Sequence, residues 1–221
     1  MARKFVFFDV GSTLLFANRD RMLQPLYERG IVPSEKDLRA LECIVKNEFD
    51  DILEHDGRAD HGFWDMFYMR LFEKHQLTDE PLRQRLIANT RNSSNWDQMR
   101  PGTRAALERI AARHQIAVIS NADGKIAELL GRCGIADCFR TITDSGIVGH
   151  EKPHPRIFET ALASLGAQPA ESLYVGDVYA VDYHGATGAG MEAVLFDVCG
   201  AYRDKGLPRV ETLEELISLL A

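Results

Sequence analysis

The chain has 221 residues, 45% of them hydrophobic, which is enough for one large domain, or for a domain with a smaller insert, built on a substantial core. Its net charge of −7 argues against a nucleic acid or an anionic membrane as the main partner, although a bound metal would still allow an anionic small molecule. The sequence has no run of membrane-spanning length, no signal peptide at its start and no metal-ligand spacing among its four cysteines. We therefore expect a soluble cytoplasmic protein with free thiols.

Short apolar runs predict the strands of a parallel sheet. They are rich in β-branched and aromatic residues, are bounded by Gly, Asp or Asn, and occupy residues 5–8, 116–120, 172–176 and 193–197. Helical periods follow at 126–133 and 157–165, and the last ten residues before Ala221 form another amphipathic pattern. Alternating strands and helices predict an α/β fold, a Rossmann-like open sheet with helices on both faces.

The segment from 17 to 99 has a different character. It shows no convincing strand, is richer in charged and aromatic residues, and contains helical stretches at 35–55 and 62–75. The α/β pattern restarts near Pro101 and Gly102, just ahead of an amphipathic helix. We therefore predict a core made of residues 1–16 and 100–221, with a helical insert at 17–99.

Polar residues follow the predicted strands. In a parallel sheet the carboxyl ends of the strands meet at one edge, where ligands bind. The residues at these ends are Asp9, Ser120, Asn121 and Asp177, with Asp182 five residues further on and Lys152 in a loop before a helix. Clustered carboxylates suit Mg²⁺, which would let an anionic nucleophile approach a phosphoryl group while a lysine spreads the remaining charge.

Four motifs carry a family resemblance. They are "FDVGSTL" (8–14), "VISNA" (118–122), "EKP" (151–153) and "VGDVYAVDYHGATGAGM" (175–191). In this order they resemble the haloacid dehalogenase-like (HAD) hydrolase superfamily, in its subfamily with a helical cap, and the last motif resembles the Reg-2-like branch. The resemblance covers 1–16 and 100–221 and implies that residues 17–99 are the cap.

The resemblance implies a role for each matching residue. Asp9 would be the nucleophile and a metal ligand, and Lys152 would orient the phosphoryl group. Mg²⁺ would be bound by Asp9, the backbone carbonyl of Gly11 and Asp177, and Asp182 would support Lys152 or a metal-bound water. Ser120, Asn121 and Thr13 would bind phosphate or steady the nucleophile loop. The implied activity is a Mg²⁺-dependent phosphatase of small phosphorylated compounds acting through an aspartyl-phosphate.

Gly11 departs from the family pattern. In the phosphatases of the family this position is an aspartate, whose carbonyl binds Mg²⁺ and whose side chain is the general acid and base. Gly11 retains the carbonyl but has no acid, so turnover of an alkyl phosphate is expected to fall by about 10²- to 10⁴-fold. Gly11→Asp is expected to raise turnover if the aspartate fits.

Three interpretations therefore remain open. A phosphatase could use a substrate with a good leaving group, or an acid from the cap, for which the candidates are His55, His61 and Tyr68. The second is a hydrolase of another kind. A phosphonoacetaldehyde-type hydrolase would use a cap lysine to form a Schiff base, although Lys36, Lys46 and Lys74 are expected at the surface. A haloacid dehalogenase-like activity would need no acid. The third is a weakly active phosphate-binding or regulatory module. One or two of Phe63, Trp64 and Phe67 are expected to close over the substrate.

Overall fold

The core is a parallel sheet with six strands in the described part of the chain. The computed structural model describes residues 3–56 and 62–221. The strands run in the order β5 (Ile142–Asp144), β4 (Gln115–Ser120), β1 (Phe5–Phe8), β6 (Ser172–Gly176), β7 (Glu192–Phe196) and β8 (Arg209–Val210), and every neighbouring pair is parallel. The predicted Rossmann-like α/β fold is confirmed. Sequence patterns missed β5 and β8, which have only three and two residues and show too little periodicity.

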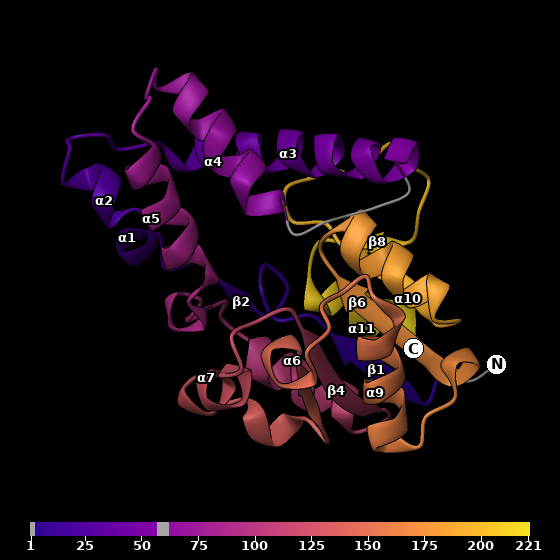
Figure 1. Ribbon diagram of the computed structural model, residues 1–221. Coiled ribbons are helices and arrows are strands. Elements are labelled where there is room, and N and C mark those ends of the chain that lie inside the picture. The colour runs from indigo at the N-terminus through magenta and orange to yellow at the C-terminus, as the bar shows by residue number, and fades with distance from the viewer. Residues whose placement is uncertain (1–2, 57–61) are drawn as a thin grey trace.

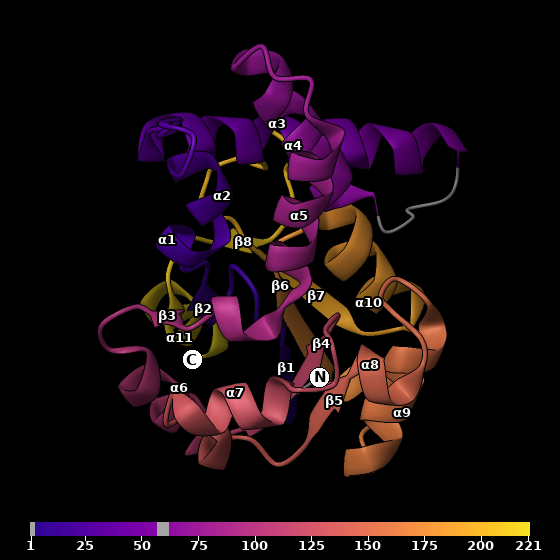
Figure 2. The ribbon, with the colours of Figure 1, turned by 60° about the vertical axis from the view of Figure 1, so that its left-hand side comes forward.

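Successive residues of the central strands alternate between two apolar clusters, one on each face of the sheet. Val6 and Phe8 pack with residues of α6 (Thr103–Ala111), α7 (Ile126–Arg132) and α11 (Leu213–Leu220). Phe5 and Phe7 pack against α9 (Pro155–Leu165) and α10 (His184–Gly188). Figure 2 shows the sheet between these two groups of helices, with α8 (Ser145–Val148) beside α9. The shorter turns are η1 (Ser93–Asn95), η2 (Ala136–Cys138), η3 (Pro169–Glu171) and η4 (Tyr179–Tyr183).

The helices between β1 and β4 that precede η1 form a separate layer, which we call the cap helices. They are α1 (Arg19–Met22), α2 (Gln24–Tyr27), α3 (Glu35–Asp56), α4 (Phe63–Lys74) and α5 (Glu80–Arg91), and they share an apolar cluster of their own. The chain leaves the core through β2 (Leu15–Phe16) and returns through β3 (Gln98–Met99), and these two strands pair antiparallel. They stand at the boundaries proposed for the cap, residues 17–99, although β3 lies inside this segment, for which no strand was expected. Figure 1 shows the cap helices together at one end of the molecule.

The helix α3 connects the cap helices to the core. The Asp50 carboxylate accepts a hydrogen bond of 3.0 Å from the backbone N–H of Ala180 in η4, and Phe49 packs against the same alanine. These contacts hold α3 over the end of the sheet where β6 finishes. Although α3 has 22 residues, its sequence is rich in charged groups, and none of the described helices is long and apolar enough to cross a membrane.

Candidate active site

The first element of the site is the loop after β1. The backbone N–H of Asp9 continues the sheet by donating to the carbonyl of Val175 at 2.8 Å, so the Asp9 carboxylate emerges at the edge of the sheet. The loop then folds back on itself, because Leu14 and Leu15 both donate to the carbonyl of Val10 at 2.9 Å. Within it Ser12 has a φ of 54°, the left-handed region that few non-glycine residues adopt. Asp9 is buried, with 7% of the residue exposed.

Lys152 is the cation at the centre of the site. Its ammonium donates to Asp9 Oδ1 at 2.7 Å, to Asp182 Oδ1 at 2.8 Å and to the Tyr174 hydroxyl at 2.8 Å. Burial by itself lowers the pKa of Lys152, but the Asp182 and Asp9 carboxylates outweigh burial and raise this pKa above its ordinary value. The lysine is therefore held as a cation directly beside the predicted nucleophile.

Asp182 occupies a supporting position. Its Oδ2 accepts the backbone N–H groups of Asp177 and Val178, both at 3.0 Å, and its Oδ1 accepts Lys152 and the Tyr174 hydroxyl. Four donors leave this carboxylate little capacity for a metal ion. Its close approach to β6 depends on Gly176, since a Cβ at that position would lie 2.4 Å from the Asp182 Cγ. The glycine before Asp177 is thus needed for the carboxylate that orients Lys152.

Asp9 and Asp177 fit a divalent cation. Carboxylate oxygens of Asp9, Asp177 and Asp182 all lie within 4.8 Å of one another. Burial is the largest effect on both predicted ligands: it raises the pKa of Asp9 to about 7 and that of Asp177 to about 6, although neighbouring lysines oppose it. Buried carboxylates at this separation are stabilised by a cation, and hard oxygen donors are the ligands that Mg²⁺ prefers. Gly11 lines the same cavity and has a backbone carbonyl to contribute.

The structure corrects the expectation for one cap lysine. Lys46 was expected at the surface, but it is 1% exposed and its ammonium donates to Asp177 Oδ2 at 2.7 Å. Burial lowers the pKa of Lys46, yet Asp177 and Glu42 outweigh burial and raise it well above its ordinary range. The sequence spacing of α3 gave no sign of this contact, because it depends on how α3 lies across the core. Lys36 and Lys74 are at the surface as expected.

The predicted phosphate-binding residues take different positions. Ser120 is buried at the end of β4 and lines the cavity. Asn121 also lines it, but its amide holds the loop of Lys152: it accepts the Lys152 N–H at 2.7 Å and donates to the Lys152 carbonyl at 3.0 Å. Thr13 is buried within the nucleophile loop, and its hydroxyl has no hydrogen-bond partner among the described residues. Phosphate binding by these residues stays a prediction.

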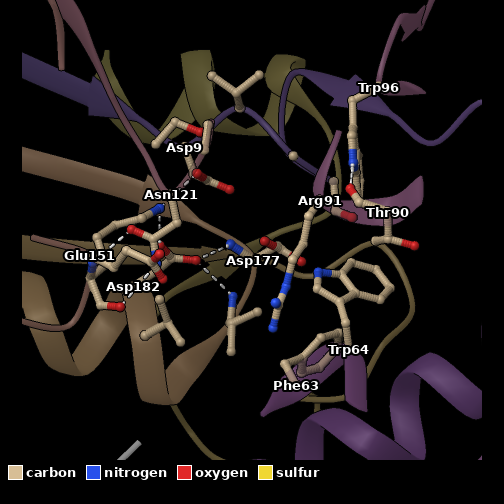
Figure 3. Close-up of a pocket in the computed structure, with 18 of the residues that line it drawn as sticks. Asp9, Phe63, Trp64, Thr90, Arg91, Trp96, Asn121, Glu151, Asp177 and Asp182 are labelled. Atoms are coloured by element: carbon tan, nitrogen blue, oxygen red, sulfur yellow. Dashed lines mark hydrogen bonds and ion pairs between the residues drawn. The ribbon is translucent and has the colours of Figure 1, made fainter. Parts of the chain in front are cut away.

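A cavity of about 480 Å³ lies between the strand ends and the cap helices. On the core side it is lined by Asp9, Ser120, Lys152, Asp177 and Asp182, and on the cap side by Phe63, Trp64, Thr90, Arg91 and Trp96. Figure 3 shows Asp182 and Glu151 on the left of the view and Phe63, Trp64 and Trp96 on the right, with Asp177 between them. Sequence reasoning missed Arg91 and Trp96, because neither belongs to a motif, and it missed Tyr174, whose pattern is that of an ordinary buried strand residue.

Of the three cap acids considered from the sequence, the two in the described part of the chain, His55 and Tyr68, do not line this cavity. His55 is exposed, and its ring nitrogen Nδ1 lies 2.7 Å from the Asp51 carbonyl. Tyr68 is buried in the cap, where its hydroxyl lies 2.5 Å from the Thr90 hydroxyl. His61 lies outside the described residues. Of the three aromatic candidates, Phe63 and Trp64 line the cavity, whereas Phe67 lines a neighbouring one.

The site combines strand-end carboxylates, a buried lysine and a helical cap. Comparison with known proteins identifies the family that has this combination. A family profile described as haloacid dehalogenase-like hydrolase matches residues 4–190, and the chain belongs to this family of hydrolases. The chain is 31% identical to the bovine (Bos taurus) haloacid dehalogenase-like hydrolase domain-containing protein 3 over 144 residues, 63% of this chain and 57% of that protein. It is 41% identical to a glyceraldehyde 3-phosphate phosphatase of Methanothermobacter thermautotrophicus over 97 residues, 43% of each chain.

A solved structure supports the fold. The HAD-hydrolase YfnB of Bacillus subtilis, determined with bound magnesium, superposes with a TM-score of 0.72 at 18% identity and covers 100% of this chain and 99% of its own. The curated relatives are matched over less of their length: the chain spans about half of each. The family and the fold are therefore shown, while the activity is argued from the site below.

Proposed function

We propose that the chain is a Mg²⁺-dependent phosphatase of small phosphorylated compounds that forms an aspartyl-phosphate on Asp9. The observation that carries this proposal is the contact of 2.7 Å between Asp9 and Lys152 at the floor of a cavity, with Asp177 close by. A buried carboxylate next to a fixed cation is suited to attack an anionic phosphoryl group. The names of the archaeal relatives, glyceraldehyde 3-phosphate phosphatases, support the same class of reaction.

Each residue of the site would have its own role in the reaction. The Asp9 carboxylate would attack phosphorus, and the bond from phosphorus to the leaving oxygen would break with its electron pair on that oxygen. Lys152 would balance the charge on the phosphoryl group, while Asp182 and Tyr174 keep its ammonium in place. Mg²⁺, held by Asp9, Asp177 and the Gly11 carbonyl, would supply charge neutralisation when bound. Water would then release phosphate from Asp9.

The proposal is tested by phosphate release from a panel of phosphomonoesters and acyl phosphates, with and without Mg²⁺. Metal-dependent turnover is expected, and Asp9→Asn should reduce it by about 10⁴-fold or more, since it removes the nucleophile. Asp137→Asn is the matched control, because Asp137 is exposed and pairs with the surface residue Arg104. A folded, Mg²⁺-binding protein that releases phosphate from no member of the panel would contradict the proposal.

One observation favours a second candidate. Lys46 is buried at the site, where a phosphonoacetaldehyde-type hydrolase would need a lysine to form a Schiff base. Against this candidate, Asp177 and Glu42 raise the pKa of Lys46, whereas a Schiff base requires the free amine. Borohydride in the presence of phosphonoacetaldehyde distinguishes the two: covalent labelling of Lys46 in wild type, absent in Lys46→Arg, would favour the carbon–phosphorus hydrolase.

A further inference from the structure

An indole ring lies beside Gly11. A Cβ placed on Gly11 would lie 3.5 Å from Trp96 Cζ3 and 3.6 Å from Cε3, so Trp96 lies in the direction that a side chain at position 11 would take. The ring is held there, because Trp96 Nε1 donates to the Thr90 carbonyl at 2.8 Å. Where the phosphatases that this chain resembles carry an acid, this chain therefore presents an apolar aromatic surface.

Trp96 is one member of an aromatic wall, which we define as Phe63, Trp64 and Trp96. The ring centroids of Trp64 and Trp96 lie 5.6 Å apart, and those of Phe63 and Trp64 lie 5.0 Å apart, both pairs in edge-to-face geometry. All three side chains are half-buried and line the cavity that contains Asp9. A flat apolar group would be covered by this wall while its phosphate lay at Asp9 and Lys152.

The absence of an acid at position 11 also favours a substrate with an aromatic group next to the phosphate. When the bond from phosphorus to oxygen breaks without a proton donor, the leaving oxygen departs as an anion. A phenol-type oxygen has a pKa of about 10, whereas the oxygen of water, which an aliphatic alcohol resembles, has a pKa of about 15.7. The aromatic oxygen is by far the better leaving group, and it takes its proton from solvent afterwards.

We propose that the preferred substrates are aryl phosphates, whose aromatic leaving group packs against Phe63, Trp64 and Trp96 and departs as a phenoxide. This inference rests on the proposed phosphatase activity and names its substrate class. Three carboxyl side chains that also line the cavity are alternative proton donors. They are Glu42, which contacts Lys46 at 3.4 Å, Asp123, which accepts the Ser93 N–H at 3.3 Å, and Glu151.

The test compares four kinds of substrate. Substituted phenyl phosphates provide leaving groups of graded pKa, benzyl phosphate keeps the ring but leaves as an alkoxide, acetyl phosphate leaves easily without a ring, and glyceraldehyde 3-phosphate has neither property. We expect kcat/KM for phenyl phosphate to exceed that for benzyl phosphate by about 10²-fold or more, with a steep dependence on leaving-group pKa. A shallow dependence, or equal turnover of benzyl and phenyl phosphates, would overturn the inference and indicate one of the three carboxyl groups as acid.

Variants of the wall test the packing separately. Trp64→Leu should raise KM for phenyl phosphate by roughly five- to tenfold and change KM for acetyl phosphate much less, because only the former places a ring on the wall. Trp96→Phe is the milder second variant, and Met69→Leu, exposed on the same helix as Trp64, is the control. Equal KM changes for both substrates would overturn the inference. Absence of turnover on acetyl and phenyl phosphates alike would instead contradict the proposed phosphatase itself.

Discussion

The two sides of the cavity are built in different ways. On the core side two charged groups are each held by several hydrogen bonds: Lys152 contacts three oxygen atoms, and Asp182 accepts four donors. On the cap side Phe63 and Trp64 are placed by ring contacts, which tolerate substitution by other apolar groups. We propose from this difference that the core side determines the chemistry, whereas the cap side determines which leaving group is accepted.

After the loss of the nucleophile in Asp9→Asn, the largest expected effect is also on the core side, at Lys152. Lys152→Met leaves the buried carboxylates of Asp9 and Asp182 without their cation, which costs about 3–5 kcal/mol in the free energy of unfolding for a fully buried pair. Activity should fall by about 10²- to 10³-fold as well, since the phosphoryl charge is no longer balanced. Denaturant unfolding and phosphate release measure the two losses.

The control for this variant is Lys125→Met, which removes an exposed lysine from the loop before α7. It should leave both quantities within error of wild type. Equal stability of Lys152→Met and Lys125→Met would show that Lys152 does not neutralise the core-side carboxylates, and the contrast between the two sides of the cavity would lose its basis.

The second prediction concerns pH. Burial raises the pKa of Asp9 to about 7, above its ordinary value, so the folded metal-free protein binds more protons than the unfolded chain between about pH 4 and 7. Asp9 therefore makes its largest contribution to the free energy of unfolding at low pH. This contribution falls by on the order of 2 kcal/mol as the pH rises towards 7. Denaturant unfolding of the metal-free protein at pH 5 and pH 8 measures this loss.

The Asp9→Asn variant isolates this contribution. Asparagine does not titrate, so the variant should lose less stability than wild type between pH 5 and pH 8. Adding Mg²⁺ at pH 8 should restore the stability of the wild-type protein, because the metal binds the ionised carboxylates of the folded state. Parallel pH profiles for the two proteins would mean that Asp9 titrates normally in the fold.

The third prediction concerns the contact of Lys46 with Asp177, where the cap side of the cavity meets the core side. The Lys46 ammonium occupies a position next to a predicted Mg²⁺ ligand, so the metal has to compete with it. Lys46→Met should tighten Mg²⁺ binding by about tenfold, within the usual range of coupling free energies. Calorimetric titration with Mg²⁺ alone measures this, and Lys36→Met, an exposed lysine of the same helix, should leave the affinity unchanged. Unchanged or weaker binding in Lys46→Met would show that the lysine and the metal do not compete.

The smallest effect is expected at Gly11. Because a side chain at position 11 would contact the Trp96 ring, Gly11→Asp by itself should change turnover of glyceraldehyde 3-phosphate by less than about threefold, far below the 10²- to 10⁴-fold of an effective acid. In a Trp96→Leu background the same change should raise turnover, since the carboxyl group then has room. A full gain in Gly11→Asp with Trp96 intact would show that the indole does not occupy the acid position.

The sequence predicted the core side well, for a physical reason. Buried strands of four to six residues leave clear apolar runs, and the polar residues that follow them must arrive at one edge of a parallel sheet. Asp9 and Asp177 are brought together there by topology alone. The short strands β5 and β8 leave no such run and were not found.

Sequence patterns did not predict most of the residues on the cap side of the cavity. Lys46, Arg91 and Trp96 come from three separate segments, and their positions depend on how the cap helices pack on the core. A buried lysine in α3 has the same local pattern as an exposed one, because its partner Asp177 lies 131 positions further along the chain. Such long-range pairings follow from tertiary packing and have no local signature.

The most direct test of the account is acid quenching of the enzyme during turnover of phenyl phosphate with Mg²⁺, followed by peptide mass spectrometry. We expect one phosphoryl group on the peptide that contains Asp9, removable by hydroxylamine as an acyl phosphate and absent from Asp9→Asn. Steady turnover with an unmodified Asp9 peptide, or with the phosphoryl group on another residue, would contradict the assignment of Asp9 as nucleophile.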